Sequence, residues 1–186
     1  MGMVMSKVVE IDGGAEDMAL TGALRKASRD AACLLIAGDL SAGLDAPAGW
    51  ILQLTDAPIL PIVLADGPIG TRGFALLLLA DVAVIGANAA CNDADFAALA
   101  ELAAVRLGVL NARRVLLAAD PLSELIAIGH ATRADAPFDA ARSRAEALAP
   151  MAHRLRRGWR AARDLPAGEA LAYAAWFNSV SIKEAS

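Results

Sequence analysis

Apolar and polar residues alternate in blocks along the first half of the chain, and each block has the length of one strand or one helix. Short apolar runs with β-branched residues and a nearby Asp or Gly are typical of buried strands, and they occur at 8–12, 32–40, 61–67 and 81–87. Longer segments with Leu and Ala at helical spacing occur at 15–30, 49–58 and 71–80. Strands that alternate with helices predict an α/β fold with a largely parallel sheet.

From about residue 96 the pattern becomes helical. Helices are predicted at 96–108 and 111–120, and a helix followed by a short strand at 121–135. Two further helices follow, the last of them starting at Pro166. Within 145–164 we expect arginines on the outer faces and one apolar stripe, formed by Leu148, Ala152, Leu155, Trp159 and Ala162. No repeat or linker separates the two halves. We therefore predict a single domain over 1–186, with an α/β core at about 7–95 and a mostly helical, oligomer-forming tail at about 96–186.

Composition agrees with one domain of 186 residues that has a substantial core, since 57% of the residues are hydrophobic. The densest apolar stretch, 73–90, is nearly long enough to span a membrane, but Asp81 interrupts it at its middle. A charge at the centre of a bilayer is costly, so a helix followed by a strand is predicted there and no membrane span. Residues 1–12 lack the long apolar region of a secretory signal, and we expect a cytoplasmic protein.

Charge and motif content exclude several classes of function. The formal net charge of −4 disfavours nucleic-acid binding. Cys33 and Cys91 lie in apolar surroundings, which predicts buried thiols instead of a disulfide framework. His130 and His153 have no metal-ligand spacing, and no G-x-S-x-G motif occurs. These absences disfavour a zinc enzyme and a serine hydrolase.

A run of glycines precedes the predicted helix at 71–80. Gly67, Gly70 and Gly73 form the pattern G-x-x-G-x-x-G, with Arg72 inside it. This is neither the dinucleotide-binding fingerprint nor a Walker loop, since no Gly-Lys-Ser/Thr follows. Glycines ahead of a helix bring backbone N–H groups close to a negatively charged group, so the turn is a candidate binding site.

Three segments resemble the enoyl-CoA hydratase/isomerase (crotonase) superfamily. "PIVLADGPIGTRGFALLLLADVAVIGANAA" is similar to the glycine-rich segment of that family, and the matching residues are Gly67, Pro68, Gly73, Leu76 and Asp81. "LLIAGDL" is similar to the family's strand that ends in A-G-x-D-L, and "LGVLNARRVLLAADPLSELIAIGHATR" to a later helical segment. The three follow one another in the family order and cover about residues 8–135. The resemblance implies a crotonase-like ββα spiral with a C-terminal helical region.

The resemblance also implies a ligand, an acyl-CoA thioester, and an enolate that is stabilised during the reaction. Its carbonyl oxygen is expected between the backbone N–H groups of Asp39 and Arg72. The turn around it is expected to consist of Gly38, Gly67, Gly70 and Gly73. Coenzyme A is part of the substrate, so no separate cofactor and no metal are expected. The CoA phosphates are expected near Arg154, Arg157 and Arg160, for which a solvated helix face is the alternative.

Hydratases of this family use two glutamates, and the sequence departs from that pattern. The first glutamate is replaced by Ala75, while the second falls at Asp95, with Asp93 as the alternative. A single aspartate could act as the base of an isomerase or hydrolase, or it could only cap the helix at Phe96. The resemblance therefore implies a hydratase/isomerase-type lyase or isomerase of fatty acid metabolism with weakened or altered catalysis. The alternative is a non-catalytic acyl-CoA-binding or structural oligomeric subunit.

Arg72 stands where the family has its middle glycine. It keeps its backbone N–H, and its guanidinium is expected over the surface or paired with Asp66 or Asp93, because a buried unpaired charge is costly. A homotrimer or a dimer of trimers is implied by the resemblance. An apolar surplus in the tail, at Trp159, Trp176 and Phe177, is consistent with such contacts.

Overall fold

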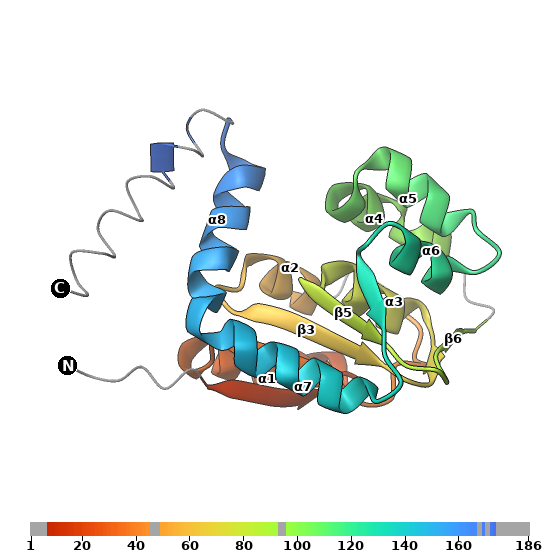
Figure 1. Ribbon diagram of the computed structural model, residues 1–186, viewed down its shortest axis with the longest axis horizontal. Coiled ribbons are helices and arrows are strands. Elements are labelled where there is room, and N and C mark those ends of the chain that lie inside the picture. The colour runs from red at the N-terminus through yellow and green to blue at the C-terminus, as the bar shows by residue number, and fades with distance from the viewer. Residues whose placement is uncertain (1–6, 45–48, 93–95, 167–168, 170–171, 174–186) are drawn as a thin grey trace.

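The chain builds a parallel five-stranded sheet with helices on both faces (Figure 1). The computed structural model describes residues 7–44, 49–92, 96–166, 169 and 172–173. In spatial order the strands of the main sheet are β1 (Val8–Asp12), β2 (Cys33–Ala37), β3 (Leu60–Ala65), β5 (Val82–Ile85) and β7 (Ala131–Arg133). A second, two-stranded parallel sheet consists of β4 (Pro68–Ile69) and β6 (Ala90–Cys91). The prediction of a largely parallel sheet is confirmed.

Successive strand–strand–helix turns make up the centre of the molecule. The first turn consists of β3, β4 and α3 (Thr71–Leu79). The second consists of β5, β6, the 3₁₀ helix η1 (Phe96–Leu99) and α4 (Ala100–Leu107). Each turn adds one strand to the main sheet and one to the small sheet, which confirms the predicted ββα spiral.

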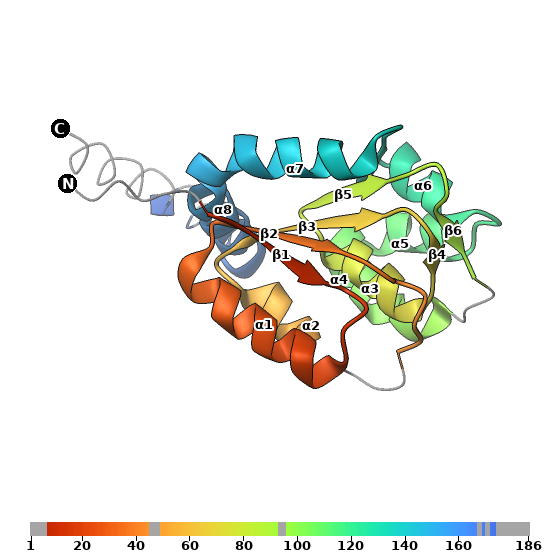
Figure 2. The ribbon, with the colours of Figure 1, turned by 90° about the horizontal axis from the view of Figure 1, so that it is seen from below.

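Helices cover both faces of the main sheet, and its central strands β2, β3 and β5 are mostly buried. Helices α1 (Asp17–Asp30), α2 (Gly49–Asp56) and α3 cover one face, and α7 (Pro137–Leu148) lies across the other (Figure 2). Strand β2 shows the division, since Leu34 and Ile36 belong to the cluster under α1–α3 while Cys33 and Leu35 belong to the cluster under α7. A strand covered on both faces is apolar at every position, which is why these runs show no alternation in the sequence.

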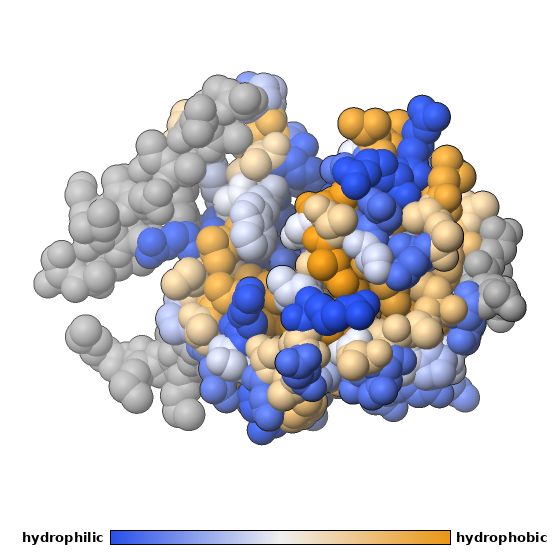
Figure 3. Space-filling view, turned by 45° about the vertical axis from the view of Figure 1, so that its right-hand side comes forward, coloured by the Kyte–Doolittle hydropathy of each residue, from blue (hydrophilic) through white to orange (hydrophobic). Residues whose placement is uncertain are grey.

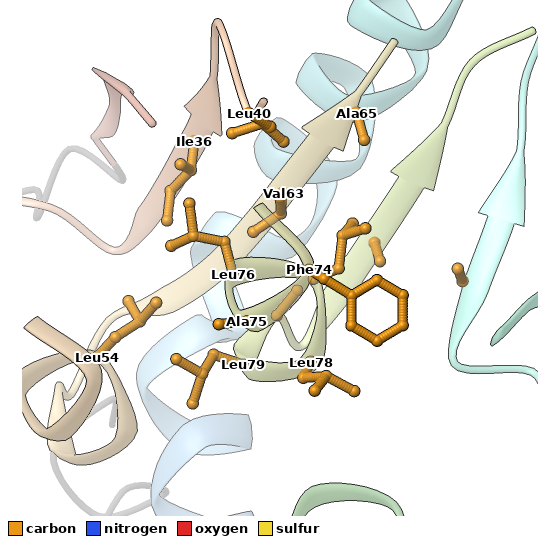
Figure 4. Close-up of a cluster of buried hydrophobic side chains, with 14 of the residues drawn as sticks. Ile36, Leu40, Leu54, Val63, Ala65, Phe74, Ala75, Leu76, Leu78 and Leu79 are labelled. Atoms are coloured by element: carbon orange, nitrogen blue, oxygen red, sulfur yellow. The ribbon is translucent and has the colours of Figure 1, made fainter. Parts of the chain in front are cut away.

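Helix α3 has no solvent-facing side. All nine of its residues are buried, so its sequence lacks the polar stripe of a surface helix. Its leucines pack against Ile36 and Val63 of the sheet and Leu54 of α2 (Figure 4). The ring centroids of Phe74 and Phe96 are 4.5 Å apart, which joins α3 to η1.

The helices α4, α5 (Val109–Leu116) and α6 (Pro121–Ala127) form a separate layer beside the sheet (Figure 1). Gly108, with a φ of 76°, lets the chain leave α4 and start α5 directly, so α5 begins two residues before the predicted position. Asp120 caps α6 by accepting from the backbone N–H groups of Leu122 and Ser123.

The predicted apolar stripe over 145–164 is wrong in its second half. Around Pro150 the 3₁₀ turn η2 (Ala149–Met151) separates α7 from α8 (Ala152–Asp164) and changes the helix direction. Trp159 on α8 is 46% exposed, whereas Arg156 is only 2% exposed. The guanidinium of Arg156 donates to three carbonyl oxygens at the end of α2, and buried cations require such partners. Most of the helix predicted from Pro166 onward lies outside the described residues.

The two cysteines differ in burial. Cys33 is fully buried, as predicted, and burial raises the pKa of its thiol to about 11. Cys91 is only half-buried. None of the described helices combines the length and the apolar character that crossing a membrane requires.

Candidate functional site

The glycine turn before α3 is shaped by close approach of the chain's own backbone. A Cβ added at Gly70 would lie 2.2 Å from a carbonyl oxygen of segment 40–42, and one added at Gly73 would lie 2.4 Å from another. Neither glycine has a positive φ, so the requirement is space and not conformation. A Cβ at Gly67, in the same turn, would meet nothing within 4 Å. Two of the three glycines are therefore needed to make room for the backbone of segment 40–42.

Backbone hydrogen bonds attach this segment to the start of α3. Leu40 forms a parallel bridge with Ile69. The N–H of Gly70 donates to the carbonyl oxygen of Leu40 at 2.9 Å, and the N–H of Arg72 donates to that of Ala42 at 3.1 Å. The N–H of Arg72, one of the two expected oxyanion-hole donors, thus has an acceptor from its own chain. Within the described residues, the N–H of Asp39 shows no acceptor. The two-amide oxyanion hole stays a prediction.

The guanidinium of Arg72 points away from this turn, toward α1. It donates to the carbonyl oxygen of Ala15 and pairs with Asp17 at 2.9 Å. Its central carbon lies 5.9 Å from the ring centroid of Trp50, and the indole N–H of Trp50 donates to the same Asp17 carboxylate at 3.0 Å. The expected pairing with Asp66 is therefore wrong, because the side chain leaves the helix on the side of α1.

An acidic edge surrounds the turn. Asp12 is the last residue of β1, and Asp39 and Asp66 come shortly after the ends of β2 and β3. Their carboxylates accept backbone N–H groups at 2.9, 2.9 and 3.1 Å. The hydrogen bonds from Ser41 lower the pKa of the Asp39 carboxyl. A cavity of about 150 Å³ lies here, and Gly38 and Gly67 line it together with two of these aspartates. The structure thus brings the predicted glycines 38 and 67 together at the carboxyl ends of β2 and β3.

A larger apolar cavity of about 700 Å³ adjoins the glycine turn. Its wall begins at Cys91 and Asn92, which follow the turn closely because β6 pairs with β4 and the N–H of Asn92 donates to Ile69 at 2.9 Å. The opposite wall comes from α4 and α5 and consists mainly of Ala, Val and Leu side chains. Arg113 is the one charged residue among the described residues that line it. Burial raises the pKa of the Cys91 thiol to about 11, so this thiol stays protonated at neutral pH.

Apolar side chains also face outward on this helical layer. Four of them are more than 60% exposed, namely Val105, Val109, Leu110 and Leu117. In Figure 3 hydrophobic side chains gather over this part of the surface. Exposed apolar residues that gather in one area mark interaction surfaces, whereas single scattered ones are ordinary.

None of the predicted acid–base positions places a carboxylate at the cavity within the described residues. Ala75 is fully buried among apolar side chains, so this position supplies no proton donor or acceptor. Asp93 and Asp95 lie outside the described residues. Within the described residues, no group of three or more His, Cys, Asp or Glu side chains is placed to hold a metal ion.

The arginines predicted to contact CoA lie at the other edge of the sheet. Arg160 donates to the carbonyl oxygen of Asp56 at 2.9 Å, and Arg157 lines a cavity with Pro58, just before β3 begins. Arg154 is exposed on the same helix. Gly67 follows the end of β3, and six residues of strand span about 20 Å. One chain alone therefore does not bring these arginines to its own glycine turn, and their role with CoA stays a prediction.

A buried ion cluster at the carboxyl end of α3 is a feature that sequence analysis missed. The Asp81 side chain is 5% exposed and accepts from Arg156 at 2.8 and 2.9 Å and from Arg106 at 3.2 Å. Arg106 also donates to the last carbonyl oxygens of α3. With Arg72 at its other end, α3 is held by an arginine at each terminus. The only sequence signal was an aspartate inside an apolar run, which indicates a buried partner but not which one.

The fold is of the crotonase type, and solved structures agree. The chain is similar to AtuE of Pseudomonas aeruginosa, with a TM-score of 0.73 and 21% identity over 96% of this chain and 89% of that one. It is similar to an enoyl-CoA hydratase/isomerase family protein from Silicibacter pomeroyi, with a TM-score of 0.70 and 21% identity over 91% and 92% of the two chains. It is also similar to an enoyl-CoA hydratase/isomerase from Marinobacter aquaeolei, with a TM-score of 0.69 and 16% identity over 95% and 88%.

These likenesses confirm the enoyl-CoA hydratase/isomerase fold, to which the sequence resemblance pointed. Sequence comparison adds nothing to this, since no family profile and no curated protein matches the chain. At identities of 16–21% the shared property is the fold.

Proposed function

We propose that this protein binds an acyl-CoA thioester at the start of α3 and has weakened or altered the chemistry of the enzymes whose fold it has. The observation that carries the proposal is the apolar cavity of about 700 Å³, which is lined by Asn92 and so is linked to the glycine turn by the hydrogen bond from Asn92 to Ile69. Its volume and lining suit an acyl chain. The thioester carbonyl would then face the N–H groups of Asp39 and Arg72, where the amino end of α3 favours developing negative charge.

The buried Ala75 supports altered catalysis. Hydration of an enoyl thioester needs one group to activate water and one to deliver a proton, and Ala75 can do neither. With Asp95, or alternatively Asp93, as a single base, an isomerase-type proton transfer remains open. Without a base the protein would bind the thioester and leave it unchanged.

Charge at the site bears on how the CoA nucleotide would be held. Asp12, Asp39 and Asp66 would repel its phosphates, and Arg113 is the nearest cation on the cavity wall. Arg154, Arg157 and Arg160 could serve only if α8 of another subunit approached this edge. The proposal therefore includes a homo-oligomer, a trimer or a dimer of trimers, and a monodisperse monomer in light scattering would contradict that part.

The alternative is a non-catalytic acyl-CoA-binding subunit or a structural oligomeric subunit with a degenerate site, and a specific observation favours the structural form. The N–H of Arg72 is already bonded to Ala42, and the exposed apolar residues of α4 and α5 offer a surface for subunit contacts. Under this hypothesis no acyl-CoA binds at all.

Calorimetry with octanoyl-CoA separates the two. Ala100 lines the apolar cavity and is exposed, so Ala100→Trp fills the cavity at little cost in stability. Ala98 is also exposed but does not line the cavity, and Ala98→Trp is the matched control. Excluding two methylenes costs about 1.6 kcal/mol, so affinity should fall more than tenfold in the first variant. Equal affinities in the two variants, or no binding to the unmodified protein, would refute acyl-CoA binding in this cavity.

A further inference from the structure

We propose that residues 40–42 block the acyl-CoA site from within the chain. In this arrangement, which we call the blocking segment, the carbonyl of Ala42 takes the position at the Arg72 N–H that a thioester carbonyl would take. A ligand can use that N–H only after Ala42 has moved away. The inference rests on the proposed function, because it concerns control of the same site.

The fit between turn and segment is specific. Gly70 and Gly73 are in van der Waals contact with the segment's carbonyl oxygens, so close that any Cβ there would overlap them. A glycine kept only for a ligand would leave open space next to its Cα, as is the case at Gly67. The turn thus fits residues 40–42 closely, and the N–H of Arg72 would otherwise face the ligand.

The segment is anchored at one end and accessible at the other. Leu40 is 4% exposed and belongs to the core cluster under α1–α3. Ser41 is half-buried and Ala42 is exposed. Moving Ala42 therefore breaks the bond to Arg72 without exposing the core. The displacement of one backbone hydrogen bond lowers an apparent affinity by a factor of about 2 to 12.

Two substitutions displace the segment from different sides. Gly70→Ala places a methyl group against the carbonyls of Ser41 and Ala42, and Gly73→Ala places one against that of Leu40. Gly22→Ala on α1 is the control, since its methyl group meets nothing and Gly22 is exposed and lies outside the binding turn. In the ligand-free proteins, hydrogen exchange of the Arg72 amide should be faster in the first two variants and unchanged in the control. Octanoyl-CoA should bind the first two about 2- to 12-fold more tightly than the unmodified protein.

The unmodified protein provides a second test that does not depend on how the variants fold. In a ¹³C,¹⁵N-labelled sample, the coupling across the hydrogen bond between the Arg72 nitrogen and the Ala42 carbonyl carbon should be present. It should disappear on saturation with octanoyl-CoA.

The two tests distinguish failure of the blocking segment from failure of the proposed function. If octanoyl-CoA binds and that coupling persists, or if the two displacing variants bind no more tightly than Gly22→Ala, the blocking segment is refuted while the proposed function stands. If octanoyl-CoA binds none of the proteins, the proposed function is refuted, and the block falls with it.

Discussion

Replacing Arg72 by glycine would restore the residue pattern of the crotonase family at the centre of the glycine turn. The structure shows that the side chain does not lie in that turn, because it bonds to Ala15 and Asp17 and contacts Trp50. We therefore expect Arg72→Gly to lower stability and to leave octanoyl-CoA affinity within about twofold. An arginine that obstructed the site would instead give a large rise in affinity when removed.

The size of the destabilisation follows from these contacts. A hydrogen bond from a charged donor contributes about 1.5–3 kcal/mol. The ion pair adds about 0.5 kcal/mol, because the Asp17 side chain is 55% exposed and screened by solvent. The contact with Trp50 adds about 0.5–1 kcal/mol, and glycine in a helix costs about 0.5 kcal/mol more. Against this, the Nε of Arg72 is buried without a partner among the described residues, and its removal returns about 1 kcal/mol.

The net loss is about 2 to 4 kcal/mol, which for a chain of this length lowers the Tm by about 5–15 °C. Urea unfolding followed by circular dichroism measures the first quantity, and a thermal scan the second. A double-mutant cycle of Arg72→Met with Asp17→Ala should show coupling of about 0.5–1.5 kcal/mol. A loss below about 1 kcal/mol, or additive effects in the cycle, would mean that the anchoring of α1 through Arg72 has been overestimated.

Three further predictions concern other groups. Asp81→Asn leaves two buried arginines with one neutral partner and should lower the free energy of unfolding in urea by about 3 kcal/mol. The control Asp164→Asn, at an exposed ion pair on α8, should leave stability nearly unchanged. Similar losses in both variants would show that the buried cluster contributes no more to stability than an exposed pair. Burial lowers the pKa of His130, so the unfolded chain takes up its proton first and stability should fall as pH drops below about 6.5; His130→Gln should flatten this slope, and an unaltered slope would assign it to another group. If the protein is catalytic, Asp95→Asn should lower kcat by about 10² to 10⁴-fold with little change in Kd, and unchanged turnover of an enoyl-CoA would reject Asp95 as the base.

The sequence was sufficient to predict the strands and helices around the glycine turn, because these segments are buried and their apolar runs are long. It also indicated that the glycines bring backbone N–H groups close to another group, and the structure shows that at Gly70 and Gly73 the close neighbour is the chain's own backbone. It did not reveal what approaches, because residues 40–42 are about 30 positions earlier and carry no motif of their own.

Ion pairs were harder to foresee for the same reason. Arg72 pairs with a residue 55 positions away, and Arg156 bonds to a carboxylate 75 positions away. The pairing depends on which helix faces which, and charge patterns along the chain contain no such information. The predicted apolar stripe is wrong at Arg156, because a guanidinium with enough hydrogen-bond partners can occupy a core position that hydropathy assigns to an aliphatic residue.

The complete burial of α3 has a consequence for how the chain can be divided. One side of the helix is covered by the amino-terminal half, through Leu54 and the sheet, and the other by Phe96, Arg106 and the ring of His130, which contacts the Leu77 carbonyl at 3.0 Å. A fragment that ends at residue 92 would leave the apolar helix residues from Phe74 to Leu79 half uncovered and would aggregate when expressed alone. The two halves are therefore suited to fragment complementation, in which each becomes soluble and folded only when the other is supplied.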